Sequence, residues 1–328
     1  MADYLHNSIP GLRYGQKILP SEIIGYDGYI FGNTYYVDAT NGSDSNPGTT
    51  SDKAYATVAE AYDNMTTNNH DVVYISGYAE HTLTSMLSVS KNRCHFIGAD
   101  FDGRRYGQST RISLTATSGA TNIATLQNTG VRNSFKNIKF SNASTVDEGI
   151  YCVADGGEYT VIDSCEMYKS TDLDITGAAE FLCNGDAGQY RNCYIGSTVN
   201  AISGAILRPC VLLTRETITG KVARDITFED TIFARKCGNT GNRFVYGANA
   251  TDVERLGLFD SCIFWNAALA TAVPAQNVAF GASLTDGAVL LRNCSAMNAA
   301  TAMSTTTGVF VDGPVPAAAT TGIALQAS

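Results

Sequence analysis

The chain has 328 residues, enough for a complete hydrophobic core, and only 16% of them are charged, well below the roughly 25% usual for a soluble domain. Apolar residues make up 44% of the chain, which excludes disorder over most of its length. The net charge of −9 argues against nucleic acid as a partner, because phosphate binding needs a basic surface, and no apolar run is long enough to predict a membrane span.

The first 34 residues form a Tyr-rich segment that differs from the rest of the chain. Tyr4, Tyr14, Tyr26 and Tyr29 lie in it without a helical period, and it lacks the basic start and apolar stretch of a secretory signal. We therefore expect an N-terminal arm over 1–34, whose apolar side chains pack on the remainder of the chain or on a neighbouring molecule.

Residues 35–49 combine a short Tyr-Val strand with a loop rich in Asn, Asp, Gly and Pro. Oxygen side chains of this kind can bind Ca²⁺, but their spacing departs from the EF-hand pattern, and such residues are ordinary loop formers. We interpret them as loop formers and predict no metal site. The four side chains concerned are Asp38, Asn41, Asp44 and Asn46.

A short helix is predicted over 57–66. Thr57 and Glu60 have the capping-box spacing that begins many helices, and the apolar residues that follow recur at helical intervals. We expect this helix to cover the open end of the structure whose first strand is Val72–Ile75. Its apolar face consists of Val58, Ala61, Tyr62 and Met65.

A six-residue motif then recurs six times between 135 and 296. Its first, fourth and sixth positions are apolar or small, and its third position is Asn, Asp or Ser. Successive fourth positions are 27, 28, 38, 31 and 32 residues apart. The fourth positions are Ile138, Cys165, Cys193, Thr231, Cys262 and Cys294.

One such unit cannot bury its apolar side chains alone, so we expect the units to stack and their fourth positions to form one inner column. Short strands followed by Gly-, Asn- or Asp-rich turns lie upstream of most copies. The predicted fold class is all-β, a right-handed parallel β-helix over 35–312 with an N-terminal capping helix, extended terminal arms and a tail over 313–328. About eight or nine rungs of roughly 4.8 Å fit between Val72 and Asp312. A β-sandwich is the alternative.

The loop at 35–49, the Phe96-Ile97-Gly98 segment and the repeated motif together resemble the pectin-lyase-like family of β-helix proteins, found among bacterial surface and phage virion proteins. The resemblance implies the fold, but the scaffold hosts many activities. The family's pectate lyases use Ca²⁺ held by carboxylates and an Arg base. Here 161–165 lacks the Trp and His of their pattern, Arg208-Pro209 lacks the required second Arg, and the polygalacturonase-like motifs are absent.

Paired carboxylates are another route to catalysis, because glycoside hydrolysis uses two of them. Asp163 with Glu166, Glu229 with Asp230, and Glu229 with Asp260 are the candidate pairs. Outward strand positions are polar in any protein, and we interpret these pairs as surface residues. No catalytic, cofactor-binding or metal-binding residue is assigned.

The longest step of the repeat predicts an extruded loop over 214–224, which either contacts a partner or is a tolerated surface loop. The nine Cys show no CxxC spacing and are interpreted as reduced thiols. The chain has a single Trp, Trp265, whereas a surface on which sugars stack usually carries several aromatic residues.

These observations predict a non-enzymatic phage virion protein, such as a capsid decoration or cement protein that stabilises the particle through its arms. The expected partners are the major capsid protein or other virion proteins and further copies of the chain, as a homotrimer, in a virion assembled in the host cytoplasm. No cofactor, nucleic acid or membrane is expected. The alternatives are a tailspike-like polysaccharide depolymerase, a lyase or glycoside hydrolase acting on host surface glycans, and a bacterial surface adhesin.

Overall fold

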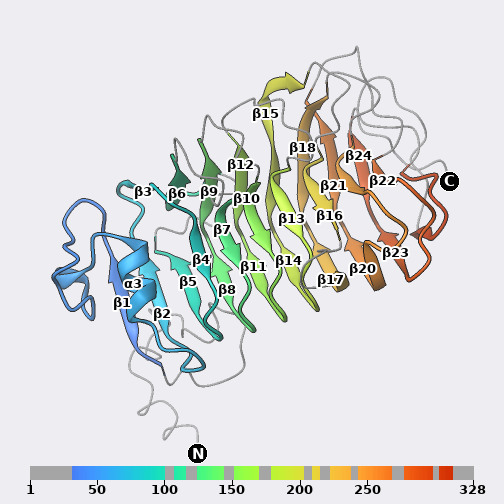
Figure 1. Cartoon of the computed structure of the whole chain (residues 1–328). Coiled ribbons are helices and arrows are strands. Elements are labelled where there is room, and N and C mark those ends of the chain that lie inside the picture. The colour runs from blue at the N-terminus through green and yellow to red at the C-terminus, as the bar shows by residue number, and fades with distance from the viewer. Residues whose placement is uncertain are drawn as a thin grey trace, which may run out of the picture.

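The computed structural model is built almost entirely from parallel strands in three sheets, each visited once per rung (Figure 1). Neighbouring rungs pair strand on strand in parallel register. No helix among the described residues is long and apolar enough to cross a membrane. The described residues are 32–99, 107–115, 124–143, 151–169, 179–202, 209–214, 222–237, 243–267, 277–297 and 303–312.

Sheet A is the longest sheet and has ten strands. They are β1 (Thr34–Val37), β2 (Val72–Ile75), β5 (His95–Gly98), β8 (Ser134–Lys136), β11 (Val161–Asp163), β14 (Gln189–Arg191), β17 (Ala223–Glu229), β20 (Val253–Asp260), β23 (Gly287–Arg292) and β25 (Val309–Asp312).

Sheet B follows sheet A in each rung and has eight strands. They are β3 (Glu80–Leu83), β6 (Arg111–Leu114), β9 (Lys139–Asn142), β12 (Glu166–Lys169), β15 (Tyr194–Ile202), β18 (Ile232–Cys237), β21 (Ile263–Asn266) and β24 (Ser295–Met297).

Sheet C completes the rung and has seven strands. They are β4 (Leu87–Val89), β7 (Ala124–Asn128), β10 (Tyr151–Asp155), β13 (Phe181–Cys183), β16 (Val211–Leu213), β19 (Val245–Gly247) and β22 (Val278–Phe280). The chain winds A, B, C, A through successive rungs, so the fold is a right-handed parallel β-helix, as the sequence predicted.

The six-residue motif forms the corner between sheets A and B. Its third residue has a positive φ in every copy, between 49° and 57°, a region that Asn and Asp tolerate better than other side chains. This single bend turns the chain so that the fourth residue again points inward. The fourth residues from Ile138 to Cys262 are fully buried, and Cys294 is partly buried, which confirms the predicted inner column.

Aromatic side chains at the first and sixth positions of the motif stack from rung to rung inside the prism. The rings of Phe228 and Phe259 lie 4.8 Å apart and nearly parallel, and those of Phe233 and Phe264 lie 5.2 Å apart. Offset ring pairs of this kind add stability beyond the apolar area that they bury. The repeat period therefore sets up one continuous core along the axis.

A polar network lies inside the prism at the corner between sheets C and A. Asp155 is completely buried there and accepts hydrogen bonds from Tyr190 Oη at 2.7 Å, Asn128 Nδ2 at 2.8 Å and Thr160 Oγ1 at 3.1 Å. Burial raises the pKa of the Asp155 carboxyl, and these hydrogen bonds act in the opposite direction.

The first rung is covered by a 3₁₀ turn, η2 (Ser51–Lys53), and one helix, α3 (Val58–Asn64) (Figure 1). Thr57 caps α3 by accepting a hydrogen bond from the Glu60 backbone N–H at 3.2 Å. The helix buries an apolar face against the core, where the ring of Tyr62 lies 6.3 Å from that of Phe96.

Three predicted features lie wholly or mostly outside the described residues. They are the arm over 1–34, of which only the last residues are described, the centre of the loop at 214–224, and the tail over 313–328.

Candidate functional site

The outward face of sheet A carries a continuous row of side chains, one from each rung, which we call the outward row. Strand register places its ten members directly above one another. Adjacent strands lie about 4.8 Å apart, so side chains in the row are within reach of their neighbours. The members are Tyr36, Tyr74, Ile97, Lys136, Asp163, Arg191, Glu229, Asp260, Arg292 and Asp312.

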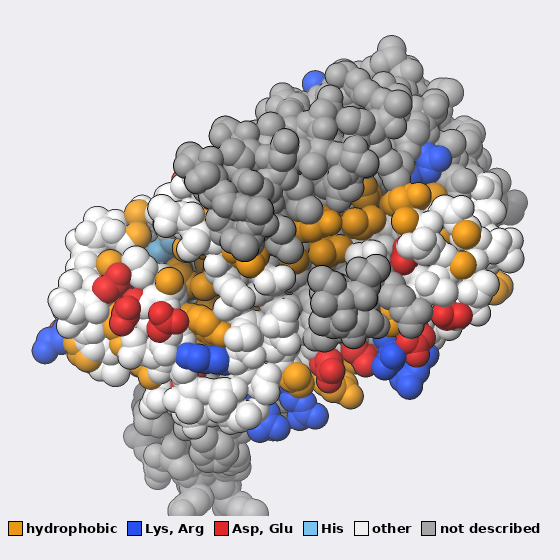
Figure 2. All heavy atoms as spheres, viewed as in Figure 1, with side chains coloured by type: hydrophobic (Ala, Val, Ile, Leu, Met, Phe, Trp, Pro, Cys, Tyr) orange, Lys and Arg blue, Asp and Glu red, His pale blue; other side chains and the backbone are white. Residues whose placement is uncertain are grey.

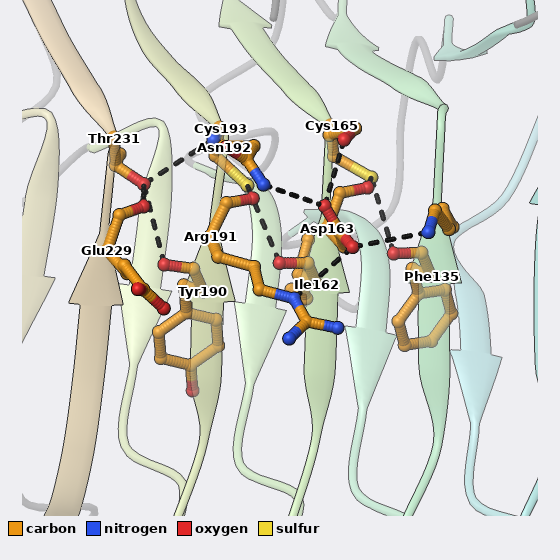
Figure 3. Close-up of polar contacts among 12 residues, drawn as sticks. Phe135, Ile162, Asp163, Cys165, Tyr190, Arg191, Asn192, Cys193, Glu229 and Thr231 are labelled. Atoms are coloured by element: carbon orange, nitrogen blue, oxygen red, sulfur yellow. Dashed lines mark hydrogen bonds and ion pairs between the residues drawn. The ribbon is translucent and has the colours of Figure 1, made fainter. Parts of the chain in front are cut away.

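Ion pairs tie the centre of the outward row together. Figure 3 shows Arg191 reaching from β14 to Asp163 on β11. The Asp163 carboxylate accepts from Arg191 Nε at 3.2 Å and lies 3.3 Å from Lys136 Nζ. It also accepts from Ser164 Oγ at 2.8 Å and Asn192 Nδ2 at 3.3 Å, both on the corner residues of the motif. The alternation of charge from Lys136 to Arg191 is the arrangement that stabilises a parallel ladder.

Two carboxylates follow next to each other, in the order Arg191, Glu229, Asp260, Arg292. Glu229 and Asp260 are register partners on β17 and β20. Arg292 donates to Asp260 at 2.5 Å and holds the pKa of that carboxyl below its usual value. Glu229 is exposed and forms no ion pair within the described residues.

Of the carboxylate pairs that the sequence suggested, register joins only Glu229 and Asp260 on one face. Asp163 and Glu166 belong to sheets A and B, and Glu166 is paired with Lys139 at 2.6 Å. Asp230 follows Glu229 in the chain but is the bent corner residue, with a φ of 49°.

The outward face of sheet C differs from that of sheet A, because its central row carries no carboxylate within the described strands. Figure 2 shows hydrophobic side chains along the middle of this face, over β10, β13 and β16. Among the described strands, the outward ion pairs therefore lie on sheets A and B, and only sheet A carries two adjacent carboxylates in one row. The sheet C row is Ser88, Gln127, Ala154, Leu182, Leu212, Tyr246 and Ala279.

The Asx-rich loop before α3 uses its polar side chains to hold its own backbone. Asp38 accepts from the backbone N–H groups of Thr40 and Asn41, at 2.8 and 3.2 Å. Asp44 accepts from the N–H groups of Ala56 and Thr57, both at 2.9 Å. These contacts are those of a loop former, the role that the sequence favoured for these residues.

Two surface features were not identified from the sequence. The first is the stack of Tyr36 and Tyr74 on the outward side of β1 and β2, with ring centres 5.7 Å apart. The second is the alignment of the charged residues in the outward row. The signal for the charged residues was the second position of the motif, which is charged in every copy. Trp265, which we considered as a sugar contact in the sequence analysis, lies outward on β21 and is half-buried between rungs.

The chain resembles solved structures in fold, although no protein-family model and no curated protein sequence matches it. The pectin methylesterase of Aspergillus niger aligns over 87% of this chain and 85% of its own, with 13% identity and a TM-score of 0.56. A rhamnogalacturonan lyase aligns over 82% of this chain and 75% of its own, with 14% identity and a TM-score of 0.51. The pectate lyase Pel9A aligns over 89% of this chain and 82% of its own, with 14% identity and a TM-score of 0.51.

These likenesses establish the pectin-lyase-like β-helix fold over most of the chain. They also contradict the expectation that the chain is not an enzyme, because all three of these neighbours are enzymes and none is a virion protein. The expectation relied on missing sequence motifs, and motifs are a poor guide at 13–14% identity. The virion location, the capsid partner and the homotrimer stay predictions that none of these observations tests.

Proposed function

We propose that the chain is a polysaccharide-degrading enzyme that binds an extended glycan along the outward row and hydrolyses it at Glu229 and Asp260. The observation that carries the proposal is the like-charge step between these two residues. Like charges directly opposite each other weaken a sheet, and the rest of the row from Lys136 to Arg292 alternates in sign. A local arrangement that costs stability is the kind expected at a functional site.

The two carboxylates have environments suited to different roles. The Arg292 guanidinium holds the pKa of Asp260 below its usual value, which favours the ionised form that a nucleophile requires. Glu229 is exposed, so a substrate oxygen can reach its carboxyl group. Retaining glycosidases use two carboxyl groups about 5–5.5 Å apart, and the backbones of adjacent strands lie about 4.8 Å apart.

The reaction would proceed in two balanced steps. Asp260 attacks the anomeric carbon while the glycosidic C–O bond breaks, and Glu229 gives its proton to the departing sugar oxygen. Glu229 then takes a proton from water as that water attacks the same carbon. The glycosyl–Asp260 bond breaks, and both carboxyl groups return to their starting states.

Two further observations support a glycan as the substrate class. The neighbours in fold are enzymes named for pectin, rhamnogalacturonan and pectate. In addition, Arg191 and Arg292, with side chains 32% and 45% exposed, flank the two carboxylates and offer cations to an acidic sugar.

The test is a turnover assay on pectic and bacterial capsular polysaccharides, reading new reducing ends and, separately, the ultraviolet absorbance of unsaturated products. We expect reducing ends without unsaturated products, and a loss of at least about a hundredfold in Glu229→Gln and Asp260→Asn. The matched control is Glu80→Gln, since Glu80 is an exposed carboxylate on the outward face of sheet B. Unsaturated products would indicate a lyase, and full activity in both variants would overturn the assignment of these residues.

A further inference from the structure

A groove opens at the N-terminal end of the outward row, about five rungs from Glu229 along the sheet. Its volume is about 550 Å³, within the range of small-molecule sites. The lining residues come from β1, β2, the turn after β2, the loop around η2 and the end of β5. They include Tyr36, Asp38, Tyr74 and Tyr78.

Three tyrosines give the groove its character. Tyr36 and Tyr74 stack on each other across β1 and β2, with an interplanar angle of 22°, so two aromatic rings lie together at one side of the groove. Tyr78 is 84% exposed, which makes it the most exposed large hydrophobic residue among those described. With the stacked pair it brings three tyrosines to one groove, and such clusters are typical of binding surfaces, since each ring offers an apolar face and a hydroxyl to a ligand.

The charge of the groove narrows the choice of ligand. Among the described residues of its lining, Asp38 is the one ionised side chain, and hydrogen bonds from Thr40 and Asn41 lower the pKa of its carboxyl against the effect of burial. A fixed negative charge repels uronates and phosphates, whereas carboxylate and hydroxyl oxygens accept hydrogen bonds from neutral sugar hydroxyls.

We propose that this groove is a second glycan subsite, which binds a neutral pyranose ring between the stacked pair Tyr36 and Tyr74 and the exposed ring of Tyr78. The proposal rests on the proposed function in one respect, that the ligand is a glycan. The groove and the carboxylates lie on the same row of the same sheet, with the buried Ile97 between them. The groove would anchor the substrate while hydrolysis takes place several rungs away.

The binding test uses calorimetric titration of the whole chain with neutral hexasaccharides of glucose, galactose and mannose, and with hexagalacturonate as the charged probe. We expect at least one neutral hexasaccharide to bind, and its affinity to fall about tenfold in Tyr78→Ala. Tyr159→Ala is the matched control, because Tyr159 is 53% exposed in a turn outside the groove. Unchanged binding in Tyr78→Ala, an equal loss in both variants, or no neutral ligand at all would overturn the proposal.

The charge argument has its own test in Asp38→Asn, which keeps a side-chain oxygen for the loop hydrogen bonds. We expect hexagalacturonate to bind more tightly to this variant than to the unaltered chain, while neutral binding stays the same. Equal hexagalacturonate affinity in the two would contradict the assignment of a neutral sugar.

Failure of the proposed function and failure of this proposal give different results. Glu229→Gln removes hydrolysis in the proposed mechanism but leaves the groove intact, so its affinity for the neutral hexasaccharide should equal that of the unaltered chain. Loss of binding in Tyr78→Ala together with full turnover in Glu229→Gln would refute the catalytic pair and leave the groove proposal standing. Turnover lost in Glu229→Gln, with no effect of Tyr78→Ala on binding, would refute the groove proposal and leave the catalytic pair standing.

Discussion

Replacing Tyr190 by Phe removes one hydroxyl from the interior of the prism and leaves the ring stack in place. The Tyr190 hydroxyl donates to Asp155 Oδ2 at 2.7 Å, and both side chains are completely buried. Within the described residues no other side chain or N–H group donates to that oxygen. The variant therefore leaves half of a buried carboxyl group without a hydrogen bond.

Leaving such a group unsatisfied costs about 1.5–3 kcal/mol. The loss should depend on pH, because burial raises the pKa of Asp155 and the Tyr190 hydrogen bond lowers it. A carboxyl whose pKa is raised by folding stabilises the folded state at low pH, and that contribution is lost as the pH rises through the folded-state pKa. Without the hydroxyl the pKa of Asp155 rises further, so the deficit should be larger at neutral pH than near pH 4.

Urea unfolding of the unaltered chain and of Tyr190→Phe, at several pH values, measures this deficit. Tyr159→Phe is the control, since Tyr159 is exposed and its change should stay within about 0.5 kcal/mol. A Tyr190→Phe variant as stable as the unaltered chain, or a deficit that does not change with pH, would refute the reasoning about the buried network.

Three further predictions concern stability. Burial lowers the pKa of His95 to about 3. The stability that the neutral ring provides is present above about pH 6.5, and about 2 kcal/mol of it should be lost by pH 5. In an acid titration, His95→Gln should lose less unfolding free energy than the unaltered chain. Asn192 has a φ of 54°, and both Asn192→Ala and Asn192→Gly lose its hydrogen bond to Asp163. Urea unfolding should therefore show Asn192→Ala less stable than Asn192→Gly by about 1 kcal/mol, and equal stability of the two would contradict the role of the bend. Glu180 and Arg235 form a buried ion pair, and thermal unfolding of Glu180→Ala should show a loss of about 3–5 kcal/mol, whereas a loss below about 1 kcal/mol would mean that the pair is not desolvated.

The fold could be predicted because its signal is local and repeated. Each copy of the motif carries a residue that tolerates a positive φ next to a small inward residue, and Asn192 with Cys193 illustrates the pair. Six copies at similar spacing make chance recurrence improbable, and stacking is the only way for units of that size to share a core. The helix α3 could be predicted for the same reason, because its cap and its apolar face are encoded within a few residues.

The candidate site could be predicted only in part, because it is made by register between rungs. Glu229 and Asp260 are 31 positions apart, and the sequence suggested them as neighbours but gave no reason to prefer them over Asp163 with Glu166. The preference comes from the charges on either side, which depend on the register of four strands. The groove was missed because Tyr36 and Tyr74 belong to rungs separated by the loop and helix between them.

The central claim is that a glycan lies along the outward row of sheet A. The most direct measurement is a crystal structure of Asp260→Asn, which should bind substrate without completing hydrolysis, soaked with the longest oligosaccharide that the unaltered chain cleaves or binds. The account predicts sugar density over Asp163, Arg191 and Glu229, continuing toward the tyrosines at the N-terminal end. Sugar bound on the apolar face of sheet C, with sheet A empty, would contradict it.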